Sequence, residues 1–170
     1  MSGTRRYVVL CGVLFAALQT AYFFQLTVYW SAAYPSFLAV TLAWLAGSLA
    51  GLALGARWSD RRWLAASVGA SLLAAVVLRA LPHHLAGLLV TTACLALSGA
   101  HAGAFFRRNR ELLGTAGRLF FWENNGFLLG WTIGFVAFVL AGVNGALALP
   151  PLIAVGVLVT RPTAPTGDEP

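Results

Sequence analysis

Long apolar stretches alternate with short, arginine-bearing segments along the chain. The apolar stretches cover about residues 7–29, 36–56, 64–81, 85–106, 120–140 and 146–160. A helix needs about 20 apolar residues to cross the hydrocarbon core of a bilayer, and the first five stretches reach or approach that length. The pattern therefore predicts an all-α, polytopic transmembrane helix bundle of about six spans over residues 1–160. We expect residues 161–170 to form a disordered cytoplasmic tail.

The first and last stretches each have a second interpretation. The first follows two arginines, as a signal peptide does, but its apolar part is longer than a normal signal core, so we expect it to be retained. The last runs over only residues 146–160 and contains Pro150-Pro151, so it begins earlier, tilts or kinks. Asn144-Gly145 is the turn signal that precedes it.

Composition makes lipid the expected solvent. The 170 residues are 59% hydrophobic and 9% charged, whereas soluble domains carry about 25% charged residues. The net charge is +6, and all 11 basic residues are arginines, which sit mostly in short clusters outside the apolar stretches. We interpret this charge as membrane topology and expect a lipid bilayer, not nucleic acid, as the partner.

The arginines also predict an orientation. With the N-terminus in the cytoplasm, the segments on that side hold Arg5, Arg6, Arg57, Arg61, Arg62, Arg107, Arg108, Arg110, Arg118 and Arg161. Arg79 lies toward the other side. Because basic residues concentrate in cytoplasmic loops, we expect a multi-pass protein of the plasma membrane with both termini in the cytoplasm.

The motifs of soluble enzymes are missing from the sequence. It has no phosphate-binding loop, no serine nucleophile elbow, no HExxH and no paired cysteines. Its five acidic residues include two in the tail, Asp168 and Glu169. We therefore expect no enzyme activity, no catalytic residues and no metal site.

Two glycine ladders stand out within the spans. Glycines four residues apart share one helix face, so each ladder gives a flat stripe that a second backbone can approach closely. The ladders are Gly47, Gly51 and Gly55 in the second span, and Gly126, Gly130 and Gly134 in the fifth. Their equivalent places in two three-helix halves are compatible with a 3+3 inverted repeat. Ordinary bundle packing and a moving transport interface both explain such ladders.

Glu123, Asn124 and Asn125 form a polar run early in the fifth span. A carboxylate and two amides are costly in hydrocarbon unless they find partners or water. Candidate partners for the carboxylate are Arg118, Arg62 and Arg107. Two interpretations follow: the run joins helices or reaches the cytoplasmic surface, or it binds a substrate, a proton or a partner.

Other polar side chains lie inside the predicted spans. Gln19 and Gln25 could line a cavity or hydrogen-bond between helices. His101 has small neighbours that leave room for a flat cofactor, so a haem or chlorophyll is an option there, although we expect no cofactor. A hydrogen bond to a neighbouring helix is the simpler role for this histidine. His83 and His84 mark the opposite membrane face.

Three segments resemble the membrane domain of spermidine synthase-like integral membrane proteins. Ala43–Trp63 is similar to the second helix and following loop of that family, which in turn resemble the loop signature of major facilitator transporters. Ser98–Arg108 is similar to the fourth helix, with Gly103 where the family has proline. Gly117–Gly134 is similar to the fifth helix. The matching residues are Gly55, Asp60, Arg61, Arg62, Arg118, Leu119, Glu123, Gly126 and Gly130.

The resemblance covers about residues 7–159 and implies a six-helix unit related to half a facilitator, in a bacterial plasma membrane. The family often carries an aminopropyltransferase-like soluble domain after the helices. We expect that domain to be absent here, so polyamine synthesis does not carry over. The expected function is transporter-like, with a homodimer or other membrane subunits completing the pathway. The alternative is a non-catalytic structural or assembly subunit of a respiratory or photosynthetic membrane complex.

Overall fold

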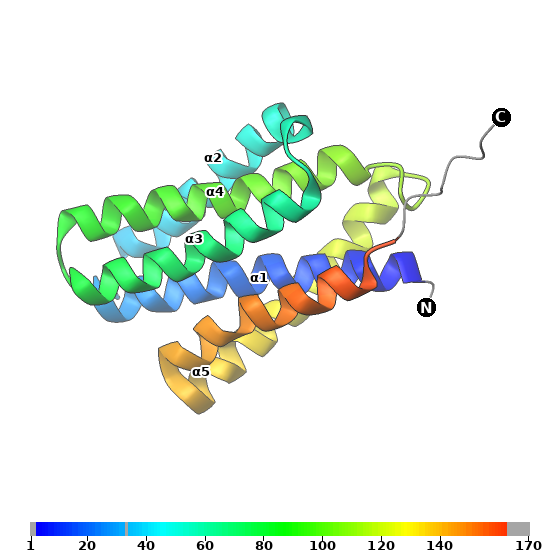
Figure 1. The fold of residues 1–170 in the computed structure, drawn as a ribbon. Coiled ribbons are helices and arrows are strands. Elements are labelled where there is room, and N and C mark those ends of the chain that lie inside the picture. Colours follow the sequence, from blue (N-terminus) through cyan, green and yellow to red (C-terminus); the bar gives the residue numbers. More distant parts are fainter. Residues whose placement is uncertain (1–2, 33, 163–170) are drawn as a thin grey trace.

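The structure, a computed structural model, describes residues 3–32 and 34–162. Its helices are α1 (Gly3–Tyr29), α2 (Tyr34–Leu54), α3 (Asp60–Ala80), α4 (Leu85–Asn109) and α5 (Ala116–Thr160), with a short 3-10 turn, η1 (Gly55–Arg57), after α2 (Figure 1). Each of the five helices is long and apolar enough to cross a membrane. The all-α prediction is confirmed. Residues 163–170, most of the predicted tail, lie outside the described residues.

Within the described residues, five separate helices stand where six spans were predicted. The stretches predicted as the fifth and sixth spans both belong to α5, a helix of 45 residues whose backbone leaves helical geometry only at Gly142 (φ 61°, ψ −155°). This region of backbone space is open almost exclusively to glycine. The break comes two residues before the predicted Asn144-Gly145 turn, because Gly142 can adopt it without a side-chain clash.

At Gly142 the chain folds back on itself, so α5 has two legs, residues 116–141 and 143–160 (Figure 1). A Cβ placed on Gly145 would overlap the carbonyl oxygen of Ala137, eight residues earlier, which a continuous helix would hold about 12 Å away. Both legs also reach the same level of α1: Gly126 lies against Val9, and Gly156 lies near the Leu10 side chain.

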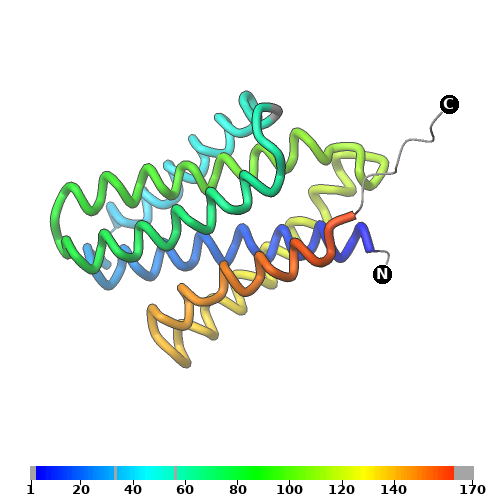
Figure 2. The backbone as a smooth tube through the Cα atoms, viewed as in Figure 1, coloured from blue at the N-terminus to red at the C-terminus, as the bar shows by residue number. Residues whose placement is uncertain are grey.

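Helix α1 is the most buried of the five and forms the centre of the bundle. Helix α5 packs along it, while α2 and α3 pack on α4 (Figure 2). Tyr22, Phe15, Leu14 and Leu18 of α1 are fully enclosed. Because the core is built around α1, removing this helix as a signal peptide would leave the other helices without their common partner.

The outer surface of the bundle is strongly apolar. Large hydrophobic side chains are exposed on all five described helices, most of them outside α1, among them Leu42, Leu49, Val76, Leu89, Leu128, Leu140, Leu152 and Val159. Soluble monomers rarely expose contiguous apolar patches of this extent. The surface is therefore that of an integral membrane protein whose solvent is lipid.

Polar contacts gather at the two ends of the bundle. At one end Asp60 forms ion pairs with Arg108 and Arg161. This end, which we call the arginine-rich end, also contains both described chain termini and the α2–α3 and α4–α5 connections (Figure 1). At the opposite end Arg79 of α3 donates hydrogen bonds to Tyr29 of α1 and to Asn144 beside the α5 turn.

Candidate functional site

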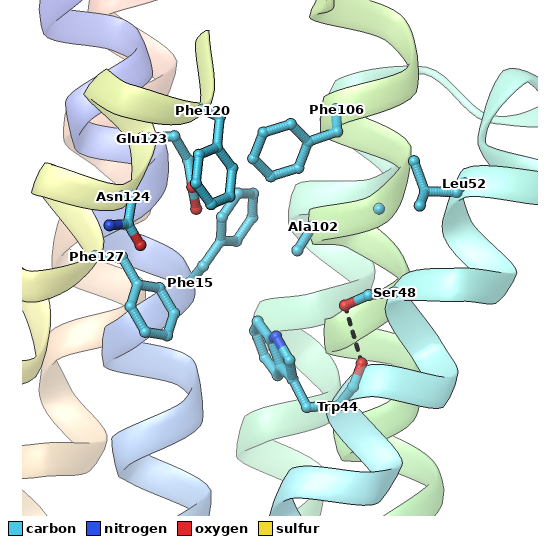
Figure 3. A pocket seen from close by; sticks show the side chains of 11 residues that line it. Phe15, Trp44, Ser48, Leu52, Ala102, Phe106, Phe120, Glu123, Asn124 and Phe127 are labelled. Atoms are coloured by element: carbon cyan, nitrogen blue, oxygen red, sulfur yellow. Dashed lines mark hydrogen bonds between the residues drawn. The ribbon is translucent and has the colours of Figure 1, made fainter. Parts of the chain in front are cut away.

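A cavity of about 230 Å³ lies between the α1–α5 pair and the α2–α4 pair. Each of the four helices contributes to its wall (Figure 3). The lining residues are Phe15, Trp44, Ser48, Leu52, Ala102, Gly103, Phe106, Phe120, Glu123, Asn124 and Phe127. The backbones of α2 and α5 stay apart in the part of the chain that the structure describes, so the cavity opens sideways between these two helices.

Helical spacing accounts for the side chains that meet in the cavity. Trp44, Ser48 and Leu52 are four residues apart and form one stripe on α2. Phe120, Glu123, Asn124 and Phe127 form the corresponding stripe on α5, at spacings of three and four residues. Residues at these spacings share a helix face. Each helix therefore presents one continuous stripe to the same space.

Among the residues that the structure describes, Glu123 is the only acidic one that lines this cavity. Its side chain is 6% exposed and has no hydrogen bond or ion pair to any residue that the structure describes. The carboxylate neither pairs with Arg118 nor reaches the surface. Arg107, a second partner considered from the sequence, donates instead to the carbonyl oxygens of Leu52 and Ala53 at the end of α2.

Aromatic rings make up most of the remaining wall. The rings of Phe106 and Phe120 lie 6.1 Å apart between α4 and α5, on the side of the cavity nearest the arginine-rich end (Figure 3). Trp44 lies deeper, one turn before Ser48, whose hydroxyl donates to the Trp44 carbonyl (2.9 Å). Phe15 of α1 forms the back wall. The carboxylate of Glu123 thus belongs to a space walled by aromatic rings and aliphatic groups.

The two glycine ladders lie at the interfaces that flank the cavity. Gly47 and Gly51 of α2 and Gly55 of η1 face Ala96, Ala100 and Ala104 of α4 in register. On the other side, Gly126, Gly130 and Gly134 of α5 face Val9, Val13 and Thr20 of α1. The contacts are reciprocated, since Gly99 and Gly103 of α4 face α2, and Gly12 of α1 faces α5. Both helix pairs are therefore in direct backbone contact.

The loop residues singled out from the sequence have different surroundings. Asp60 lies 3.0 Å from Nε of Arg108 and 2.9 Å from Nη2 of Arg161, so one carboxylate joins the start of α3 to the ends of α4 and α5. Arg62 and Arg118 are exposed and make backbone N–H contacts to the caps Ser59 and Thr115. Arg61 is exposed beside Leu64 and Leu158.

His101 is enclosed on α4. Its Nδ1 lies 2.9 Å from the Ser67 hydroxyl, and the Phe15 ring meets it edge-on at 5.1 Å. The space beside it, next to Tyr7 and Cys11, measures about 10 Å³, which is room for about one water molecule. A haem or chlorophyll does not fit there in this arrangement of the helices.

The remaining intramembrane candidates do not join the cavity. Gln19 is partly buried on α1, and Asn125 is exposed and donates to the Phe121 carbonyl (2.7 Å). Gln25 is fully buried, and neither polar atom of its amide has a partner among the described residues. Of the polar residues singled out from the sequence, only Glu123 and Asn124 lie in the cavity wall.

Comparison with known proteins identifies no relative of this chain. Neither the family models, nor the curated proteins, nor the solved structures contain a match to the chain.

Proposed function

We propose that the chain is a transporter-like integral membrane protein in which the two legs of α5 cross the bilayer separately, giving six crossings. The arginine-rich end then lies in the cytoplasm with both termini, as basic residues favour that side. One observation carries the proposal: a buried carboxylate without a partner faces a cavity between two helix pairs. Ionisable groups in membranes are costly and usually functional, and Glu123 is not used to hold the bundle together.

The helix packing supports a 3+3 inverted repeat. With the two legs of α5 as crossings five and six, such a repeat makes α1, α2 and α3 equivalent to α4, the first leg and the second leg. The α2–α4 contact is then equivalent to the contact between the first leg and α1. The α3–α4 contact is equivalent to the contact between the second leg and α1. All four contacts are present. Inverted repeats place binding sites at the repeat interface, which is where Glu123 lies.

Contacts at the two ends of the bundle would control the opening and closing of the cavity. The α1–α5 and α2–α4 pairs are each tightly packed, whereas the described backbones of α2 and α5 stay apart. We propose that the two pairs move as units. Breaking the Asp60 ion pairs and the Phe106–Phe120 contact would open the cavity to the cytoplasm. Breaking the Arg79 hydrogen bonds to Tyr29 and Asn144 would loosen the opposite end.

An oligomer is part of the proposal. The cavity opens sideways toward lipid, and Asn124 and Asn125 are exposed on α5 near that opening. Exposed amides are unfavourable against hydrocarbon, so a second copy of the chain is the partner that would cover them. The same exposed amides support the alternative, a subunit of a larger membrane complex. In that case other chains would co-purify stoichiometrically in mild detergent, whereas a homodimer supports transport.

The experiment that tests the transporter-like function measures access to the cavity from both sides. Cys11 and Cys94 are buried and free, so an alanine at each gives a cysteine-free background. A single Asn124→Cys change then places a thiol in the cavity wall. We expect a membrane-impermeant maleimide to label it in both right-side-out and inside-out vesicles, because a transporter exposes its site alternately.

Leu128→Cys is the matched control. It lies one helical turn further along α5 and is 60% exposed on the apolar surface, so it should stay unlabelled from either side. Labelling of Asn124→Cys from one side alone, or from neither, contradicts the transporter-like function and favours a static subunit.

A further inference from the structure

The cavity at Glu123 has the chemistry of a site for a small organic cation. We propose that it binds a monovalent ammonium compound, with Glu123 as counter-ion and the surrounding aromatic rings as the cage. This inference rests on the proposed function, which takes the cavity to be the substrate site, and it names the class of substrate.

The unpaired carboxylate of Glu123 favours a positively charged ligand. The chain has 11 arginines and only five acidic residues, yet among the described residues no arginine forms an ion pair with Glu123, and no basic side chain lines the cavity. The Asp60 carboxylate, by contrast, has two arginine partners. A negative charge at Glu123 would be unpaired at 6% exposure. Burying an unpaired charge is expensive, so a cation entering the cavity would gain the compensation that the protein does not supply.

The wall selects the kind of cation. Faces of tryptophan and phenylalanine attract ammonium groups through the ring quadrupole, and desolvated sites strengthen this attraction. Trp44, Phe15, Phe106, Phe120 and Phe127 all line the cavity. Calcium and magnesium ions instead take six or more oxygen ligands, and the side chains that line this cavity offer oxygens only from Ser48, Glu123 and Asn124. The lining therefore suits an alkylated ammonium ion better than a bare metal ion.

The volume of the cavity and the amide at its rim also suit a small organic ammonium ion. A volume of about 230 Å³ is below the range of about 300–1,000 Å³ typical of drug-sized ligands. The exposed amide of Asn124 at the rim could accept or donate one hydrogen bond to a hydroxyl or N–H of the ligand. Choline has this combination of a small quaternary ammonium and one hydroxyl, which makes it a suitable probe.

The test measures equilibrium binding of radiolabelled choline to the purified full chain in an uncharged detergent. Lipids with choline headgroups are left out, because they would compete. We expect saturable binding that weakens at least about tenfold in Glu123→Gln, since the counter-ion is lost. Glu111→Gln, the same chemical change at an exposed loop acid, should leave the affinity unchanged. Trp44→Leu should weaken binding several-fold.

A neutral isostere of choline, in which carbon replaces the nitrogen, serves as the second readout on the unaltered chain. It should compete at least about tenfold more weakly than choline does. Equal competition by the two compounds, equal affinities of the unaltered chain and Glu123→Gln, or no saturable binding to folded protein would each overturn the cation site. The competition by the isostere and the test for saturable binding both use the unaltered chain, so they test the cation site even if Glu123→Gln fails to fold.

The result is separable from that of the access experiment. If Asn124→Cys is labelled from both sides but choline does not bind, the transporter-like function stands and the cation site is wrong. If choline binds but labelling is one-sided, the cation site stands and the transporter-like function is wrong.

Discussion

Gly51 of α2 lies directly against the backbone of Ala100 of α4. A Cβ built on Gly51 would come within 2.8 Å of the Ala100 Cα and would overlap its carbonyl oxygen. The approach is this close because neither helix has a bulky side chain at the crossing. It recurs one turn away on each side, at Gly47 and Gly55.

Replacing Gly51 by alanine should therefore separate α2 from α4. We expect Gly51→Ala to lower the free energy of unfolding by about 1–3 kcal/mol, the usual cost of forcing atoms into a packed interface. Thermal unfolding in detergent measures it. The control is Gly69→Ala on α3, where an added Cβ meets nothing within 4 Å. Equal stabilities of the two variants would show that the contact does not hold the helices together.

The turn within α5 depends on backbone geometry alone. Gly142 has φ 61° and ψ −155°, and a Cβ there would meet no other atom within 4 Å. Gly142→Ala should thus cost about 1–3 kcal/mol through strain in a region of backbone space that only glycine populates. The measurement is the same unfolding experiment with Gly69→Ala as reference. A variant as stable as the reference would mean that α5 does not reverse at this residue.

The ion pairs of Asp60 join three helices at the arginine-rich end. In Asp60→Asn the side chains of Arg108 and Arg161 lose their shared carboxylate. Because these groups are partly exposed, we expect a loss of about 1 kcal/mol or less, which shrinks as salt is added. Melting temperatures at low and high salt give the difference. Glu111→Gln, whose partner Arg110 is highly exposed, should show no such salt-dependent loss.

The pattern of apolar residues and arginines predicted the helices better than the connections between them. Apolar length identified the helices, and arginine clusters identified the ends at which they meet. The sequence also suggested a turn in the region of Asn144, but the reversal occurs at Gly142 because backbone freedom, not turn propensity, decides it. The resulting hairpin is one element, α5, where two separate spans were expected.

Part of the lining of the candidate cavity was singled out from the sequence. Glu123 stood out because carboxylates are rare in apolar helices. Its aromatic neighbours Trp44, Phe106 and Phe127 were missed, because aromatic residues in a membrane helix also face lipid or packing interfaces, and only tertiary contacts separate these roles. The helical spacing of Trp44, Ser48 and Leu52 on α2 was an available signal. Likewise, the partners of Asp60 come from distant helix ends that no local pattern connects.

We propose that this chain is a membrane bundle whose arginine-rich end faces the cytoplasm and whose last helix crosses the bilayer twice. A single Ala141→Cys change in the cysteine-free background, combined with a fluorescent reporter fused after Pro170, tests both parts in intact bacterial cells. We expect an impermeant maleimide to label Ala141→Cys from outside and the reporter to fluoresce in the cytoplasm. A protected thiol at residue 141, or a reporter on the outer face, would contradict it.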